Sequence, residues 1–172
     1  PVLGRILRQP AHVGDNLLGP LTNPAGAHVQ VVGVFAPGWV EPVARVLAQL
    51  GSRGAFVVHG AGGLDEFSNA GVNRAAQVDG GAVRNLAVDP ADYGLPAAPP
   101  GSLAGGDAVV NAALGVEVLK GARGPRRDAV LLNAAARADG SWPFSAMANV
   151  RRGMTSDPPR TYPDVESSAP SV

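Results

Sequence analysis

Two adjacent carboxylates, Asp65 and Glu66, are the residues whose types and placement best suit chemistry. They follow a short apolar run at 55–58 and a glycine-rich segment at 60–63, which stops regular structure and lets the backbone turn. If the run is a strand, the acids lie just past its carboxyl end, where open α/β sheets bind ligands. Such a pair suits Mg²⁺, which takes one or two carboxylates and completes its shell with waters and phosphates. The alternative is an ordinary solvated turn.

Other polar groups in the sequence have simpler structural interpretations. We expect His59 to have a hydrogen-bonded structural role, because the other two histidines are far away in sequence and give no metal-ligand spacing. Asp107 follows two glycines, and we expect it to cap a helix rather than to help bind phosphate. We expect a basic cluster to face solvent or to pair with Asp128: Arg123, Arg126 and Arg127.

Composition limits the class of protein. The chain has 172 residues, 45% of them hydrophobic and 5% aromatic, so it can bury a core built mainly from Ala, Val and Leu. Lys and Arg number 14 and Asp and Glu number 14, a balance that does not favour a nucleic-acid or acidic-membrane partner. The lack of cysteine excludes disulfides and thiolate sites. No apolar run approaches the roughly 20 residues of a membrane span. We expect a cytoplasmic protein without nucleic-acid or membrane partners.

The elements that would position the acids follow the order strand, helix, strand. Residues 29–35 are β-branched and apolar, which predicts a buried strand. Residues 41–50 have apolar side chains at helical spacing, with Gly51 as a stop signal. Together with the strand at 55–58 they predict one βαβ unit whose strands are parallel neighbours.

A change of pattern follows the acids. Residues 72–78 and 82–88 flank Asp79-Gly80-Gly81, which predicts an antiparallel hairpin. Beyond it we expect one turn of helix at 89–94, an extended stretch at 95–101, and helices at 107–119 and 126–137. The fold class is therefore α/β: a partial parallel sheet with crossover helices, an appended β-hairpin and C-terminal helices.

The two ends of the chain differ from this middle part. We predict a divergent lead-in at 1–15, a partial α/β domain at 16–137, and a disordered tail at 138–172, because the tail has no apolar face to bury. Within the domain, residues 16–25 hold Gly-Pro and Asn-Pro turn dipeptides, which predict a structured loop and not a helix.

Four motifs, in order, resemble anthranilate phosphoribosyltransferase over about residues 16–136. They are Asn16-Leu-Leu-Gly-Pro-Leu-Thr-Asn-Pro-Ala25, Val57-Val-His-Gly60 with Gly63-Leu-Asp-Glu66, Gly105-Gly-Asp107 with Asn111, and Gly124-Pro-Arg-Arg-Asp-Ala-Val-Leu-Leu-Asn133. The resemblance implies the later part of that family's large α/β domain, of the nucleoside phosphorylase and phosphoribosyltransferase type. The family's N-terminal helical domain, its glycine loop for phosphoribosyl pyrophosphate and its Lys-His-Gly-Asn segment have no counterpart in this sequence.

The resemblance implies part of an enzyme of tryptophan biosynthesis that moves phosphoribose from phosphoribosyl pyrophosphate to the amine of anthranilate. It implies Mg²⁺ as the cofactor, bound by Asp65 and Glu66, and no covalent nucleophile. The substrate-binding residues it implies are Asn16, Gly19, Pro20 and Asn23, with Arg8 near the place of an arginine that contacts anthranilate. The family forms homodimers through its helical domain, so we expect the dimer contact to be missing here and the chain alone to be inactive.

Two interpretations from other classes stay open. The first is a non-catalytic relative of the same fold that binds nucleic acid, which would need a basic groove. The second is a remnant with no activity of its own. A nucleoside phosphorylase is a third, disfavoured by the Leu-Gly-Pro-Leu-Thr-Asn-Pro run, a hallmark of the anthranilate enzyme.

Overall fold

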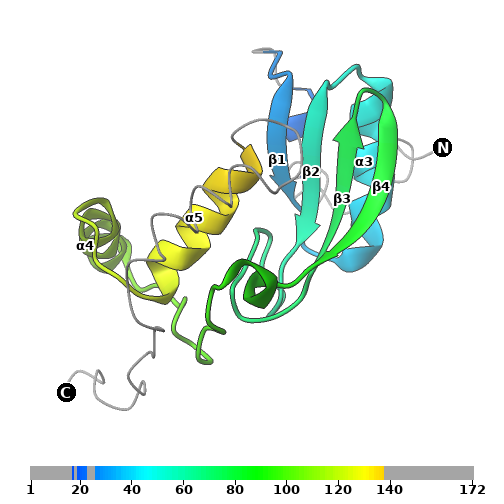
Figure 1. Ribbon diagram of the computed structural model, residues 1–172. Coiled ribbons are helices and arrows are strands. Elements are labelled where there is room, and N and C mark those ends of the chain that lie inside the picture. Colours follow the sequence, from blue (N-terminus) through cyan, green and yellow to red (C-terminus); the bar gives the residue numbers. More distant parts are fainter. Residues whose placement is uncertain (1–16, 18, 23–25, 138–172) are drawn as a thin grey trace.

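The computed structural model describes residues 17, 19–22 and 26–137 (Figure 1). Within this part of the chain, four strands form one sheet in the order β1-β2-β3-β4. The elements are β1 (Val29–Gly33), the 3₁₀-helix η1 (Pro37–Trp39), α3 (Val40–Gln49), β2 (Gly54–His59), β3 (Asn73–Asp79), β4 (Ala82–Val88), the 3₁₀-helix η2 (Pro90–Tyr93), α4 (Ala108–Leu119) and α5 (Pro125–Arg137).

The predicted βαβ unit is confirmed. β1 and β2 are parallel neighbours, paired from Val29 with Gly54 to Gly33 with Val58, and α3 connects them. β1 ends at Gly33, two residues before the expected end, although the Val34 N–H still donates to the Val58 carbonyl over 2.9 Å. Both strands therefore deliver their carboxyl ends to the same edge of the sheet.

The predicted hairpin is also confirmed. β3 and β4 pair antiparallel, and because Asp79 pairs with Ala82, Gly80 and Gly81 alone form the turn. Their φ angles of +51° and +90° suit a two-residue turn whose twist matches that of the strands. β3 pairs antiparallel with β2 on its other side, so the hairpin extends the sheet of the βαβ unit.

β2 lies between two hydrophobic clusters, because successive side chains of a strand point to opposite faces of the sheet. Ala55 and Val57 pack in the cluster that α3 covers. Phe56 and Val58 pack in the other cluster, which includes Phe67 and side chains of α5. The sheet is thus covered by α3 on one face and by α5 on the other, and this second cluster lies beneath the loop that carries the acids.

The later elements match their predictions. Asp89 accepts a hydrogen bond from the Ala91 N–H at the start of η2, and Asp107 accepts one from the Val110 N–H at the start of α4. Figure 1 shows α4 beyond α5, on the side away from the sheet, and α4 has no buried residue. Of these two helices, α5 is the one that packs against the sheet.

One prediction near the N-terminus is wrong. Residues 16–25 were expected to avoid helix, but Leu17 and residues 19–21 have helical backbone. Burial of Leu17 in the cluster under α3 stabilises this turn. Pro20 is compatible with helical backbone, because the ring of proline fixes φ close to its helical value. The predicted lead-in at 1–15 and the tail at 138–172 lie outside the described residues.

Within the described residues, no helix is long and apolar enough to cross a membrane.

Candidate functional site

The two acids lie on a loop that folds back at the end of β2. The Gly60 N–H donates to the Leu64 carbonyl over 2.7 Å, and the Gly63 N–H donates to the Gly60 carbonyl over 3.1 Å. These bonds close a tight turn, so the chain reverses direction before it reaches Asp65 and Glu66. The acids consequently lie over the carboxyl ends of β1 and β2, as predicted from the strand and the glycines.

The loop returns so close to the sheet that two positions have no room for a side chain. A Cβ at Gly33, the last residue of β1, would overlap the backbone carbonyl of Asp65. A Cβ at Gly60 would overlap the carbonyl of Glu66. The backbone of each acid therefore packs against a glycine, and the two carboxylates are the parts of these residues that can face outward.

Two side-chain amides, one half-buried and one fully buried, hold the chain directly after the acids. The Asn133 side chain, on α5, accepts from the Phe67 N–H over 2.9 Å and donates to the Phe67 carbonyl over 2.7 Å. The fully buried Asn73 accepts from the Ser68 N–H over 2.8 Å and donates to the Ser68 carbonyl over 2.9 Å. The Phe67 ring is itself buried, edge-on to Phe56 with ring centroids 6.1 Å apart. The loop is thus tied to β3, to α5 and to the core.

Asp65 and Glu66 both line one open pocket of about 600 Å³ between β1 and α5. The chain bends at Asp65 and at Glu66, so the pair does not lie on a straight strand, where neighbouring side chains point to opposite faces. Partial burial raises the pKa of the Glu66 carboxyl above its usual value, and the neighbouring Asp65 raises it further. A cation in the pocket would lower the cost of keeping both groups ionised.

The donor set fits Mg²⁺. In the described part of the chain, no three His, Cys, Asp or Glu side chains come together as a metal-binding cluster. Asp65 and Glu66 therefore offer two carboxylates and an open side, which suits an ion that keeps waters and binds substrate phosphates. The same set does not suit structural zinc, which takes four protein ligands.

Comparison with known proteins identifies the family. Residues 11–140 match the family model described as "Glycosyl transferase family, a/b domain". The chain belongs to this glycosyl transferase family. It is 56% identical over 121 residues to the anthranilate phosphoribosyltransferase of Paramagnetospirillum magneticum, and 56% identical over 120 residues to that of Pelotomaculum thermopropionicum. Each match covers 70% of this chain and 35% of the relative, so the chain spans about a third of the length of these relatives.

Solved structures agree with the family assignment. The chain is similar to the crystal structure of anthranilate phosphoribosyltransferase from Thermus thermophilus, with 41% identity and a TM-score of 0.67 over 88% of this chain and 43% of that one. It also has the fold of the Saccharomyces cerevisiae enzyme solved in complex with PRPP and Mg, at 24% identity and a TM-score of 0.68 over 88% of this chain and 45% of that one.

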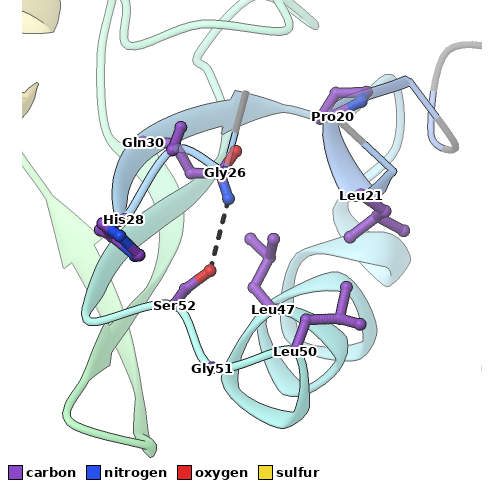
Figure 2. Close-up of a pocket in the computed structure, with 10 residues that line it drawn as sticks. Pro20, Leu21, Gly26, His28, Gln30, Leu47, Leu50, Gly51 and Ser52 are labelled. Carbon is purple, nitrogen blue, oxygen red and sulfur yellow. Dashed lines mark hydrogen bonds between the residues drawn. The ribbon is translucent and has the colours of Figure 1, made fainter. Parts of the chain in front are cut away.

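Of the residues predicted to bind substrate, Gly19 and Pro20 lie in the described part of the chain. Gly19 is exposed. Pro20 lines a pocket of about 180 Å³ at the amino ends of β1 and β2, the edge opposite the acids. Figure 2 shows Leu47 of α3 facing this pocket, with a bond from Gln30 to Ser52 across it. The structure thus does not bring Pro20 beside Asp65 and Glu66, and the predicted roles of Asn16, Asn23 and Arg8 fall outside the described residues.

His59 has the structural role expected of it, whereas Arg126, expected to face solvent or to pair with Asp128, bonds instead to a backbone carbonyl. The Nδ1 of His59 lies 2.9 Å from the Val34 carbonyl, so the ring supports the end of β1. Arg126 donates to the Ala104 carbonyl over 2.9 Å, which ties α5 to the loop before α4. Neither contact involves the acidic pair.

Sequence reasoning gave no role to two residues that shape the site, Gly33 and Asn133. A signal for each was present. An isolated glycine within a strand pattern indicates close approach of another backbone segment. A lone amide among the apolar residues of a helix needs a partner when it is buried, and Asn133 follows Leu131 and Leu132.

Proposed function

We propose that this chain is part of a phosphoribosyltransferase that joins the amine of anthranilate to the ribose of phosphoribosyl pyrophosphate, and that it contributes the Mg²⁺-binding carboxylates, Asp65 and Glu66. The observation that carries the proposal is that both acids, on a loop packed closely against Gly33 and Gly60, line one pocket between β1 and α5. The close relatives bear the name of this enzyme.

The proposed reaction needs positioning and charge neutralisation more than a reactive side chain. The amine nitrogen attacks the anomeric carbon, the bond from that carbon to pyrophosphate breaks, and the nitrogen loses a proton. Mg²⁺ bound with the substrate would neutralise charge on the departing pyrophosphate. Asp65 and Glu66 would hold the ion, while the fixed backbone around them keeps the carboxylates in place without reorganisation.

The remaining functional assignments belong to the same proposal. Gly19, Pro20, Asn16, Asn23 and Arg8 would serve the acceptor side once the rest of the enzyme is present. The cell compartment would be the cytoplasm. A catalytically inactive remnant is the alternative, because the relatives are about three times longer than the matched segment.

A chimera tests the proposal directly. The 121 matched residues of this chain would replace the corresponding segment of the Paramagnetospirillum magneticum enzyme, to which they are 56% identical. We expect an active, Mg²⁺-dependent chimera that makes phosphoribosyl anthranilate. The double substitution Asp65→Asn with Glu66→Gln keeps side-chain size but removes the charge, and should lower turnover by at least about a hundredfold.

Asp79→Asn is the matched control. Asp79 is exposed and pairs with Gly54, at the opposite end of β2 from the acids, so its loss should leave turnover unchanged. A folded chimera without activity would favour the remnant. Full activity of the double variant would remove the metal-binding role from the acids.

A further inference from the structure

We propose that Asn133 is the positioning residue of the acidic pair: by binding both backbone groups of Phe67, it sets the direction in which Asp65 and Glu66 present their carboxylates to a divalent cation. The inference rests on the proposed metal-binding role of the acids. It concerns a residue on a different element, α5, and this residue lies 66 positions after Phe67 in the chain.

The contact is specific in its chemistry. The Asn133 Oδ1 accepts from the Phe67 N–H over 2.9 Å, and its Nδ2 donates to the Phe67 carbonyl over 2.7 Å and to the Ala129 carbonyl over 3.0 Å. These three bonds use both N–H donors and the oxygen of the amide. A rotated amide would direct its NH₂ group at the Phe67 N–H, so only one orientation of the side chain is compatible with the loop.

The place of the contact makes it relevant to the acids. Phe67 directly follows Glu66, and its peptide groups fix the backbone from which the Glu66 side chain departs. On the other side, the backbones of Asp65 and Glu66 lie against Gly33 and Gly60. With both sides held, the pair has little freedom to turn away from the pocket.

Asn133 also belongs to the pocket itself. Asn133 and Ala134 of α5 line the same pocket as the two acids. Its amide is bonded to backbone groups of Phe67 and Ala129, and we assign it a role that acts through the loop. Supporting residues of this kind commonly change metal affinity by about tenfold or more when they are removed.

A second amide in the chain provides a matched control. Asn111 makes the same two-point contact with Gly106: its Oδ1 accepts from the Gly106 N–H over 2.9 Å, and its Nδ2 donates to the Gly106 carbonyl over 2.9 Å. That contact orders the start of α4 and does not involve the acids.

The test uses the full chain and Mn²⁺ as a paramagnetic probe for the Mg²⁺ site, measured by broadening of backbone amide signals. In the unmodified chain, broadening should centre on Asp65 and Glu66. Asn133→Ala should weaken Mn²⁺ binding there by about tenfold, whereas Asn111→Ala should change it by less than about twofold. Unchanged affinity in Asn133→Ala, or an equal loss of affinity in Asn111→Ala, would overturn the inference.

Amide hydrogen exchange separates this inference from the proposed metal function. Asn133→Ala should speed exchange at residues 64–68, while exchange in β2 and β3 stays slow. If the unmodified chain binds Mn²⁺ no better than the Asp65→Asn, Glu66→Gln double variant, the metal function fails and the positioning of a cation site fails with it. If Mn²⁺ binds but exchange at residues 64–68 does not respond to Asn133→Ala, only the positioning role is overturned.

Discussion

The Cα of Gly33 lies against the backbone carbonyl of Asp65, so that no side chain fits between the end of β1 and the acidic loop. This contact joins two segments that are 32 positions apart in sequence. It determines how closely the carboxylates approach the sheet, and it makes Gly33 a structural part of the site although it has no functional group.

Gly33→Ala should therefore move the acidic loop. The added methyl group would overlap backbone atoms, which cannot move aside as the tip of a flexible side chain could. We expect a loss of about 1–3 kcal/mol in the free energy of unfolding, the usual cost of overpacking. Denaturant unfolding would measure it.

Gly38→Ala is the control for this substitution. Gly38 has no atom within 4 Å of a built Cβ and does not have a positive φ, so alanine should be tolerated. A similar loss of stability in both variants would show that close approach at Gly33 is not the cause.

Asn73 should be among the most sensitive polar residues of the described chain. Its Oδ1 accepts from the Ala61 and Ser68 N–H groups, and its Nδ2 donates to the carbonyls of Ser68, Gly71 and Val88. Asn73→Ala leaves several buried backbone groups without partners and should cost about 2–4 kcal/mol. Asn85→Ala removes an exposed amide from the same hairpin and should cost less than about 1 kcal/mol in the same unfolding experiment.

Glu41 should make stability depend on pH in the acid range. Hydrogen bonds from Asn85 and Arg45, together with the charge of Arg45, lower the pKa of its carboxyl below the usual 4.5. Because the pKa is lower in the folded state, the stabilisation is present above about pH 4.5 and is lost as pH falls through the folded-state value. Unfolding midpoints of the unmodified chain and of Glu41→Gln should differ most near pH 7 and converge toward pH 3. A difference between the two unfolding midpoints that stays constant with pH would contradict this account.

Much of the fold is predictable from local pattern. The apolar β-branched run in β1, the helical spacing in α3 and the Asp-Gly-Gly turn before β4 each act within a few residues, and each predicted element is present. Caps at Asp89 and Asp107 are likewise local, because the side chain bonds to an N–H two or three positions ahead. The short turn at Leu17 was missed because its stability comes from burial against the distant core under α3.

The site is predictable only in part. The acids and the glycines before them are contiguous, so their place after β2 follows from the sequence. The contacts of Gly33 with Asp65 and of Asn133 with Phe67 join residues that are distant along the chain, and no local spacing encodes them. Pro20 lies at the opposite edge of the sheet from the acids, a relation that also depends on tertiary packing.

The isolated chain should make no phosphoribosyl anthranilate. Two carboxylates bind Mg²⁺ weakly when no phosphate completes its shell, and both repel the phosphates of the donor unless the ion is present. An assay with saturating Mg²⁺, donor and anthranilate should give no product from the chain alone. Robust product would mean that the chain contains a phosphate site of its own.

The central claim, that Asp65 and Glu66 hold a divalent cation, is tested most directly by locating the ion. Crystals of the active chimera grown with Mn²⁺ and pyrophosphate would be measured at a wavelength where Mn²⁺ scatters anomalously. The account predicts an anomalous peak in the pocket between β1 and α5, bound to a carboxylate oxygen of Asp65 or Glu66 at about 2.0–2.3 Å. A peak bound only to other residues, with both carboxylates free, would contradict it.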